Sequence, residues 1–87
     1  MNRSDVLEQA GAAISGDRHD KYGDARDNFA NIAAGWQVIF GVDVTAEQVA
    51  LAMVWVKTAR LLQTPSHDDS WLDMAGYAAL GGEVSGD

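Results

Sequence analysis

The chain has 87 residues, enough for one small domain over residues 1–87 near the lower limit of independent folding. A hydrophobic content of 47 % is compatible with a packed core, and the absence of cysteine excludes disulfides and thiolate metal sites and fits a reducing cytosol. The net charge of −7 disfavours DNA or RNA as a partner, because nucleic acids usually select a basic surface. No apolar run is long enough to span a bilayer, so we expect no membrane partner.

Apolar residues recur with helical spacing throughout, which predicts an all-α fold, a small antiparallel bundle of four helices. The first helix is predicted from Asp5 to about Ile14. Asp5 and Glu8 have the spacing of a capping box, and Gly16 is a typical helix stop. Residues 17–23 are polar and are predicted to form a connector.

The second helix is predicted to begin near Asp24 and to end at Gly41. Its large side chains fall on one face at 100° per residue, as in an amphipathic helix that packs on a core. These residues are Phe29, Ile32, Ala33, Trp36, Ile39 and Phe40.

The third helix is predicted from Thr45 to Gln63, and its segment 49–56 contains no polar side chain. One of its faces can pack on the other helices, but a nearly opposite face is also apolar and needs another cover. We therefore expect this helix to be the most buried element and the chain to form a symmetric homodimer. The interface candidates are Leu51, Trp55, Leu62 and Trp71.

The fourth helix is predicted to begin near Asp69 or Ser70 and to run to about Leu80. The pair Gly81-Gly82 follows and is expected to end it.

An antiparallel hairpin of the third and fourth helices brings Lys57 and Arg60 close to Asp69 and Asp73. One interpretation is a semi-buried salt-bridge cluster that fixes the register of the hairpin. A second is a pocket whose cations bind phosphate and whose acids bind a metal or a sugar hydroxyl, and a third is plain exposure. For the first interpretation we expect Arg60 to be the central pin, paired with Asp73 and with Asp69 as a second candidate partner.

A second polar group precedes the second helix and contains Arg18, His19, Lys21 and Tyr22. These residues form either a solvated loop with Tyr22 folded onto the core, or a loop that contacts phosphate or a base. In the latter case arginine supplies a forked donor and tyrosine a stacking surface. Arg18, His19 and Tyr22 are the candidates, and a lone histidine here is more often a loop residue than a general base.

Three stretches, RHDKYGDARDNFANIAAGW, AMVWVKTARL and DDSWLDMAGYAAL, resemble a small domain family of phages and prophages whose function is unknown. The resemblance covers about residues 18–80. The pattern is also similar to the nucleotide-modification-associated domains of phages and, more distantly, to the all-α nucleotide pyrophosphohydrolases of the MazG type. It implies a helical fold, a connection with nucleotides, and a location in the cytoplasm of an infected or lysogenic bacterium.

The chain departs from the MazG type where that type holds magnesium with two pairs of acids on adjacent helices. Here the third helix carries Lys57 and Arg60 where acids would be needed, and Glu47 stands alone near its start. A magnesium site needs several converging oxygens, so Mg²⁺ is the one cofactor we consider and none is certain. The resemblance favours binding of a nucleotide or its phosphate over catalysis, and whether the protein is an enzyme stays open. The alternative is a non-enzymatic module that acts on a host protein through its acidic surface.

Overall fold

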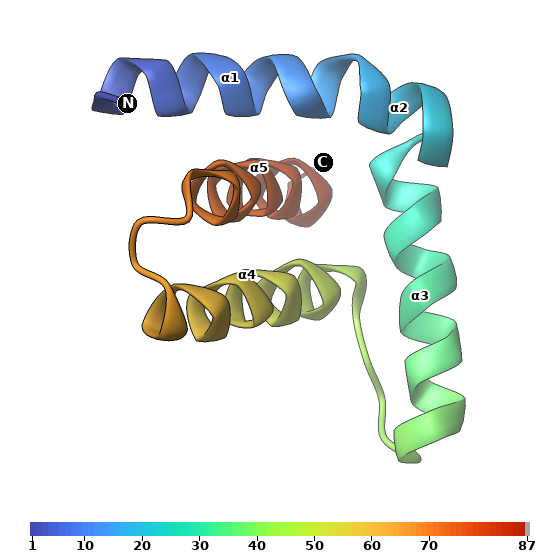
Figure 1. Cartoon of the computed structure of the whole chain (residues 1–87). Coiled ribbons are helices and arrows are strands. Elements are labelled where there is room, and N and C mark those ends of the chain that lie inside the picture. Colours follow the sequence, from blue (N-terminus) through green and yellow to red (C-terminus); the bar gives the residue numbers. More distant parts are fainter. Residues whose placement is uncertain (87) are drawn as a thin grey trace.

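The computed structural model describes residues 1–86, apart from the side chain of Asp17, and every regular element in that range is a helix (Figure 1). The long helices are α1 (Arg3–Ser15), α3 (Ala25–Phe40), α4 (Ala46–Gln63) and α5 (Asp68–Ser85), and a six-residue helix, α2 (Asp17–Tyr22), follows α1. The prediction of an all-α fold with four main helices is confirmed. None of the described helices combines the length and the apolarity that a membrane span requires.

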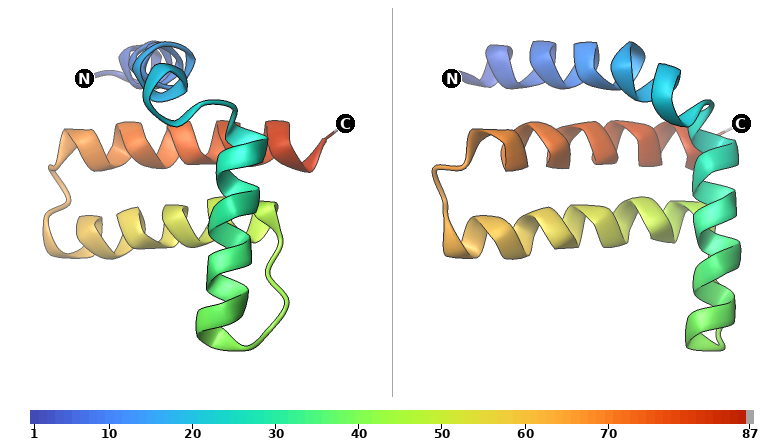
Figure 2. Two further views of the ribbon diagram at one scale, coloured as in Figure 1. Left: turned by 90° about the vertical axis from the view of Figure 1, so that its right-hand side faces the viewer. Right: turned by 45° about the vertical axis from the view of Figure 1, so that its right-hand side comes forward.

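Helix α5 lies between α1 and α4, and we refer to this stack of three helices as the layer (Figure 2). Helices α4 and α5 form an antiparallel hairpin, whereas α1 crosses the other side of α5: the left view of Figure 2 shows α1 end-on, while α5 lies across the view. Helix α3 crosses the end of this layer and continues past α4. The core lies at this crossing and consists of Ala25, Phe29, Ala33, Val49, Ala50, Leu80 and Val84.

Local capping determines where the long helices begin. Asn2 accepts the backbone N–H of Asp5, and the Asp5 carboxylate accepts the N–H of Asn2, which completes a capping box at the start of α1. The prediction that Asp5 and Glu8 form this box was therefore wrong by one helical turn. Asp24 caps α3 as predicted, and Thr45 caps α4 in the predicted box with its N3 residue.

Residues 17–22 form helix α2, so the prediction of an irregular connector was wrong. Their polarity suggested a loop, but the stretch contains no glycine or proline, and polar side chains are compatible with a solvent-facing helical turn. Gly16 interrupts the helix between α1 and α2, and Gly23, with a φ of 74°, ends α2.

Helix α5 continues through Gly81 and Gly82 to Ser85, beyond the predicted end. A Cβ atom at position 81 would lie 2.9 Å from the Cβ of Ala50 on α4, so glycine here permits a close approach of the two helices. Val84, one turn later, is buried in the core. Gly81 therefore serves packing, and burial of the final turn outweighs the low helix propensity of the two glycines.

Arg26 of α3 also stabilises the end of α5. Its guanidinium donates to the carbonyl oxygens of Glu83 at 2.9 Å and Gly86 at 3.2 Å, with a longer contact of 3.5 Å to that of Val84. The last carbonyl groups of a helix have no partner within the helix, and a positive charge there is favourable for the helix dipole. A residue 57 positions away in the sequence thus completes the C-terminal turn.

The helix with the most neighbours is α5, which packs against α1, α3 and α4. The expectation that the third long helix is the most buried element was therefore wrong. Helix α4 lies at the edge of the layer, so its outer face, with Leu51, Trp55 and Leu62, is exposed. Within residues 1–86, α3 and α5 are the helices that contact α4, and they leave its outer side uncovered.

The two adjacent glycines of α5 give a matched test of this packing. We expect Gly81→Ala to destabilise the fold by roughly 1 kcal/mol or more, because the added methyl group must push α4 and α5 apart. Gly82→Ala adds the same group where no atom lies within 4 Å, so it should stabilise the helix by about 0.5–1 kcal/mol. Urea unfolding followed by circular dichroism measures both, and equal effects would contradict the proposed role of Gly81.

Candidate ligand-binding site

A cavity of about 320 Å³ lies between α1, α2, α3 and the α4–α5 hairpin. We refer to it as the central cavity. Most of its wall is apolar, with contributions such as Ile14, Ile32 and Met53, and small-molecule sites typically have this character. Its polar wall residues are Arg18, Tyr22, Asn28, Asp73 and Tyr77. Residues of the first and third stretches quoted in the sequence analysis, RHDKYGDARDNFANIAAGW and DDSWLDMAGYAAL, therefore line the same cavity.

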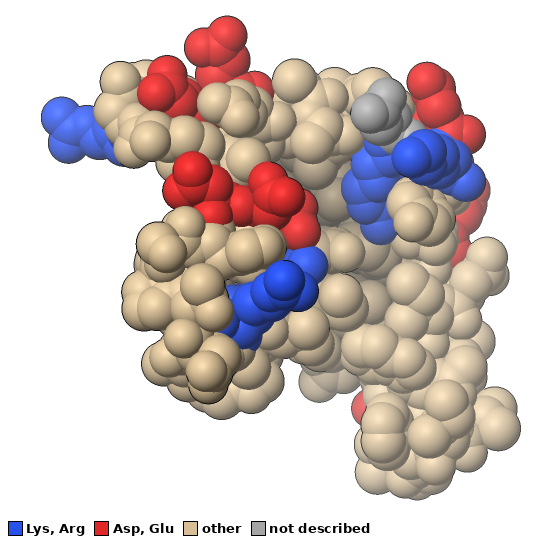
Figure 3. Space-filling view, in the orientation of Figure 1, with Lys and Arg blue, Asp and Glu red and all other residues tan. Residues whose placement is uncertain are grey.

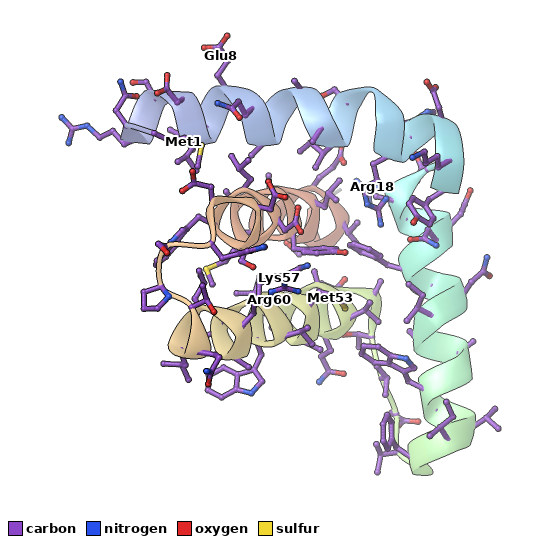
Figure 4. All side chains as sticks on the ribbon, viewed as in Figure 1. Met1, Glu8, Arg18, Met53, Lys57 and Arg60 are labelled. Carbon is purple, nitrogen blue, oxygen red and sulfur yellow. The ribbon has the colours of Figure 1, made fainter. Side chains whose placement is uncertain are left out.

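Arg18 is held at the cavity wall by aromatic and amide groups. Its Nη2 donates to Oδ1 of Asn28 at 2.8 Å, and its Cζ lies 4.9 Å from the ring centroid of Phe29 and 5.4 Å from that of Tyr22. Figure 4 shows the side chain directed inward from α2, toward α3 and α5. A guanidinium has five N–H donors, so this arrangement orients the group and leaves donors for a ligand.

The other two candidates before α3 differ in their positions. Tyr22 lies at the rim of the central cavity and is largely exposed. His19 is exposed and does not line the central cavity; it borders a separate hollow together with Arg18 and Glu83. Of the three, Arg18 and Tyr22 are thus brought to the same site.

The ion pair of the hairpin is formed by Lys57 and Asp73, whose Nζ and Oδ2 atoms are 2.9 Å apart. The Lys57 side chain is 22 % exposed and that of Asp73 is 48 % exposed, so the pair lies at the edge of the cavity and not in a sealed core. Figure 3 shows basic and acidic side chains side by side where α4 faces α5. The prediction that Arg60 pairs with Asp73 was wrong, because Lys57 is the residue that faces the carboxylate.

Arg60 is exposed near the turn before α5, and its Nη2 lies 3.4 Å from Nε2 of His67. His67 caps α5, and its Nδ1 accepts the backbone N–H of Ser70 at 3.2 Å and lies 2.8 Å from the buried Ser70 hydroxyl. With Nδ1 as an acceptor, the hydrogen of a neutral imidazole is on Nε2, which then has no lone pair for Arg60. Arg60 is therefore not fixed as a central pin.

The two candidate metal or hydroxyl ligands are not brought together at one point. Asp69 is exposed in the first turn of α5, whereas Asp73 lies in the cavity wall. Over the part of the chain that the structure describes, no group of three or more histidine, aspartate or glutamate side chains is arranged to hold a metal ion.

Asn28 and Tyr77 were not among the predicted site residues, although both belong to motifs quoted above. Asn28 holds the Arg18 guanidinium, and the Tyr77 ring lies 6.4 Å from that of Phe29, centroid to centroid. In the sequence, Asn28 is a polar residue next to the apolar stripe of its helix. Without the fold, such a residue cannot be distinguished from an ordinary solvent-facing one.

The four interface candidates are all exposed in the single chain. Leu51, Trp55 and Leu62 share the outer face of α4. Trp71 lies on α5, and its Nε1 donates to the carbonyl oxygen of Pro65 at 2.9 Å, so its indole hydrogen is already satisfied. Exposure agrees with an interface but does not test it.

The sequence profile of a family described as "Domain of unknown function (DUF6378)" matches residues 5–85. The chain belongs to this family. It is 40 % identical over 76 residues to the Gene 55 protein of Mycobacterium phage L5, and 40 % identical over 73 residues to the Gene 55 protein of Mycobacterium phage D29. These alignments cover 86 % and 84 % of the chain but 49 % and 48 % of the relatives. The chain thus spans about half the length of the curated relatives it matches. No solved structure matches the chain.

A pair of substitutions separates the roles of the two cations of α4. Lys57→Met keeps the aliphatic stem and removes the ion pair with Asp73, so we expect a loss of up to about 1 kcal/mol of stability. Arg60→Met should change stability by no more than about 0.5 kcal/mol, because Arg60 has no fixed partner. The measurement is the free energy of unfolding in urea, and a larger loss for Arg60→Met than for Lys57→Met would contradict this assignment.

Proposed function

We propose that the chain binds a nucleotide, or the phosphate of one, in the central cavity. The observation that carries this proposal is the position of Arg18. An oriented guanidinium with available donors lies at the wall of an apolar cavity that is large enough for a small molecule. Such a site suits a ligand with one anionic end and one planar, weakly polar end.

Each group at the cavity has a distinct role in this proposal. The remaining N–H groups of Arg18 bind a phosphate in the forked geometry that guanidinium offers. The planar base lies against the apolar wall, with Tyr22 at the rim as a stacking surface. Tyr77 and Asn28 supply the polar atoms that fix its orientation. Asp73 is the cavity carboxylate, and it would contact a ribose hydroxyl or the Mg²⁺ of a magnesium–nucleotide complex.

The resemblance to nucleotide-modification-associated domains and to the MazG type supports the choice of a nucleotide over other anions. It also supports a place of action in the cytoplasm of an infected or lysogenic bacterium. We propose binding without catalysis, because a catalytic magnesium site needs several converging oxygens, whereas the described cavity wall supplies the carboxylate of Asp73, which is paired with Lys57.

Thermal unfolding in the presence of nucleotides tests the proposal. A ligand at a hundredfold its dissociation constant stabilises the folded state by about 2.7 kcal/mol. For a domain of this size each kcal/mol corresponds to roughly 4–8 °C, so we expect a shift on the order of 10 °C for the best nucleotide. The screen includes mono-, di- and triphosphates with and without Mg²⁺, and the corresponding nucleosides. No shift with any nucleotide at millimolar concentration would overturn the proposal.

Two variants of α2 separate specific binding from general attraction of anions. Arg18→Gln and Lys21→Gln each remove one positive charge from the same short helix, but only Arg18 lines the cavity. The nucleotide-induced shift, measured against each variant's own melting temperature, should be abolished in Arg18→Gln and kept in Lys21→Gln. Equal losses in both variants would indicate non-specific electrostatics.

The second candidate function is a non-enzymatic module that acts on a host protein. The observation in its favour is the exposed acidic edge at the start of α5, where Asp68 and Asp69 occupy the first turn in a chain of net charge −7. Affinity capture from host lysate with the wild type and with Asp68→Asn/Asp69→Asn as baits tests it. A partner retained by the wild type and lost by the double variant is the expected result, and a partner retained equally by both would contradict it.

A further inference from the structure

The single chain exposes more surface than a folded monomer of its mass. Its accessible surface is 5842 Å², whereas a monomer of 9.3 kDa is expected to expose about 5,000 Å², an excess of roughly 850 Å². Its radius of gyration of 13.4 Å is likewise above the roughly 12 Å expected for a chain of this length. A standard protein interface buries about 800 Å² on each partner, so the excess is of the size that one interface removes.

The outer face of α4 accounts for part of this excess. Leu51 and Trp55 are each 68 % exposed and Leu62 is 78 % exposed, and their spacing places all three on one stripe of the helix. No charged residue occurs between Val49 and Val56. Isolated exposed apolar residues are common, but an uncharged stripe of this length along one helix is typical of an interaction surface.

The end of α3 adds a second apolar face at an angle to the first. Phe29, Ala33, Trp36 and Phe40 follow helical spacing on one stripe, and the first two are buried in the core. Phe40 is 65 % exposed because α3 continues past α4, as Figure 2 shows. The core stripe of α3 thus extends beyond the helices that cover it. We call the two apolar faces, at this end of α3 and on the outer side of α4, the α4 corner.

We propose that the α4 corner is occupied by a second copy of the chain. A two-fold axis across α4 pairs the α4 helices of the two copies in antiparallel orientation and lets the end of each α3 flank the partner's α4. In this arrangement Leu51, Trp55 and Leu62 of each copy face the same stripe of the other.

The charge distribution favours a second copy at this corner over other contacts between copies. Two chains of net charge −7 repel one another over most of their surface. The stripe on α4 has no charge, so its self-pairing brings no like charges together in the buried centre, where they would be costly.

The apolar area of the corner also agrees with a dimer. The exposed parts of Leu51, Trp55, Leu62 and Phe40 amount to on the order of 400 Å², taking the areas that such side chains typically bury. Slightly more than half of a typical interface is apolar, so a standard interface needs roughly 450 Å² of apolar surface per partner. The corner therefore supplies most of the apolar surface that an interface of standard size needs.

The dimer leaves the central cavity open. Met53, which lines the cavity, lies two residues from Trp55 and so on the opposite side of α4, and Figure 4 shows Met53 and Lys57 facing α5. Self-association at the α4 corner is therefore independent of ligand binding in the central cavity.

Light scattering coupled to size-exclusion chromatography tests this proposal on the full chain. At tens of micromolar the wild type should have twice the chain mass. Trp55→Glu places a charge at the centre of the stripe and should yield the monomer mass with unchanged helicity by circular dichroism. Phe40→Glu should weaken the dimer through the α3 face, so that it dissociates at higher concentration than the wild type.

The matched control is Leu7→Glu on α1, where the leucine is 69 % exposed and lies outside the corner. It makes the same kind of change at equal exposure and should remain dimeric. A monomeric wild type would overturn the proposal, as would a Trp55→Glu variant that stays dimeric. Dissociation by Leu7→Glu to the same extent as by Trp55→Glu would show that the interface is not the α4 corner.

Discussion

The close approach of other helices to the backbone of α5 is the constraint on which the rest of the structure depends. At Gly81 the neighbour is Ala50 of α4, and at Gly76 a Cβ atom would lie 3.0 Å from Cγ2 of Ile14 on α1. Because α5 has no side chain at these two points, α1 and α4 can pack closely against its backbone from opposite sides. The core then forms where α3 crosses the layer, and Arg26 completes the last turn of α5 from there. The glycine contacts of α5 and the Arg26 cation at its end stabilise the fold cooperatively. Each of these interactions forms only when the neighbouring helices are in place.

The same arrangement accounts for the central cavity. Gly76 belongs to the cavity wall, so a missing side chain brings α1 close and also leaves space next to it. The turn from α1 into α2 carries Arg18 over this space, where Phe29 and Asn28 hold its guanidinium. The exposure of the outer face of α4 follows from the same arrangement, because a helix at the edge of a layer is covered by other helices on one side only. The cavity and the α4 corner thus lie on opposite sides of α4 and can serve different partners.

In the α4–α5 hairpin, helical spacing in the sequence limits the candidate partners of Asp73 to two cations but does not determine which one forms the ion pair. Lys57 and Arg60 are three residues apart, so both were placed correctly at the end of α4 that faces the start of α5. Which of the two reaches Asp73 depends on the rotation of each helix about its axis, and a change of a few tens of degrees exchanges them. The side chains packed between α4 and α5 set that rotation, and they place Lys57 opposite the carboxylate at 2.9 Å. Arg60 is left near His67, a cap whose role was not visible in the sequence.

Local signals determined much of this protein. The cap residues Asp24 and Thr45, the glycine at position 41 and the spacing of apolar residues were sufficient for the helical class, the bounds of α3 and α4, and the two-sided apolarity of α4, since these depend on interactions within a few residues. The motifs also indicated Arg18, Tyr22 and Asp73 as chemically important. Only the tertiary structure decided that α5 continues through Gly81-Gly82 and that Arg18 and Asp73 line one cavity. Those outcomes depend on contacts between residues tens of positions apart, and on helix rotations that sequence spacing does not specify.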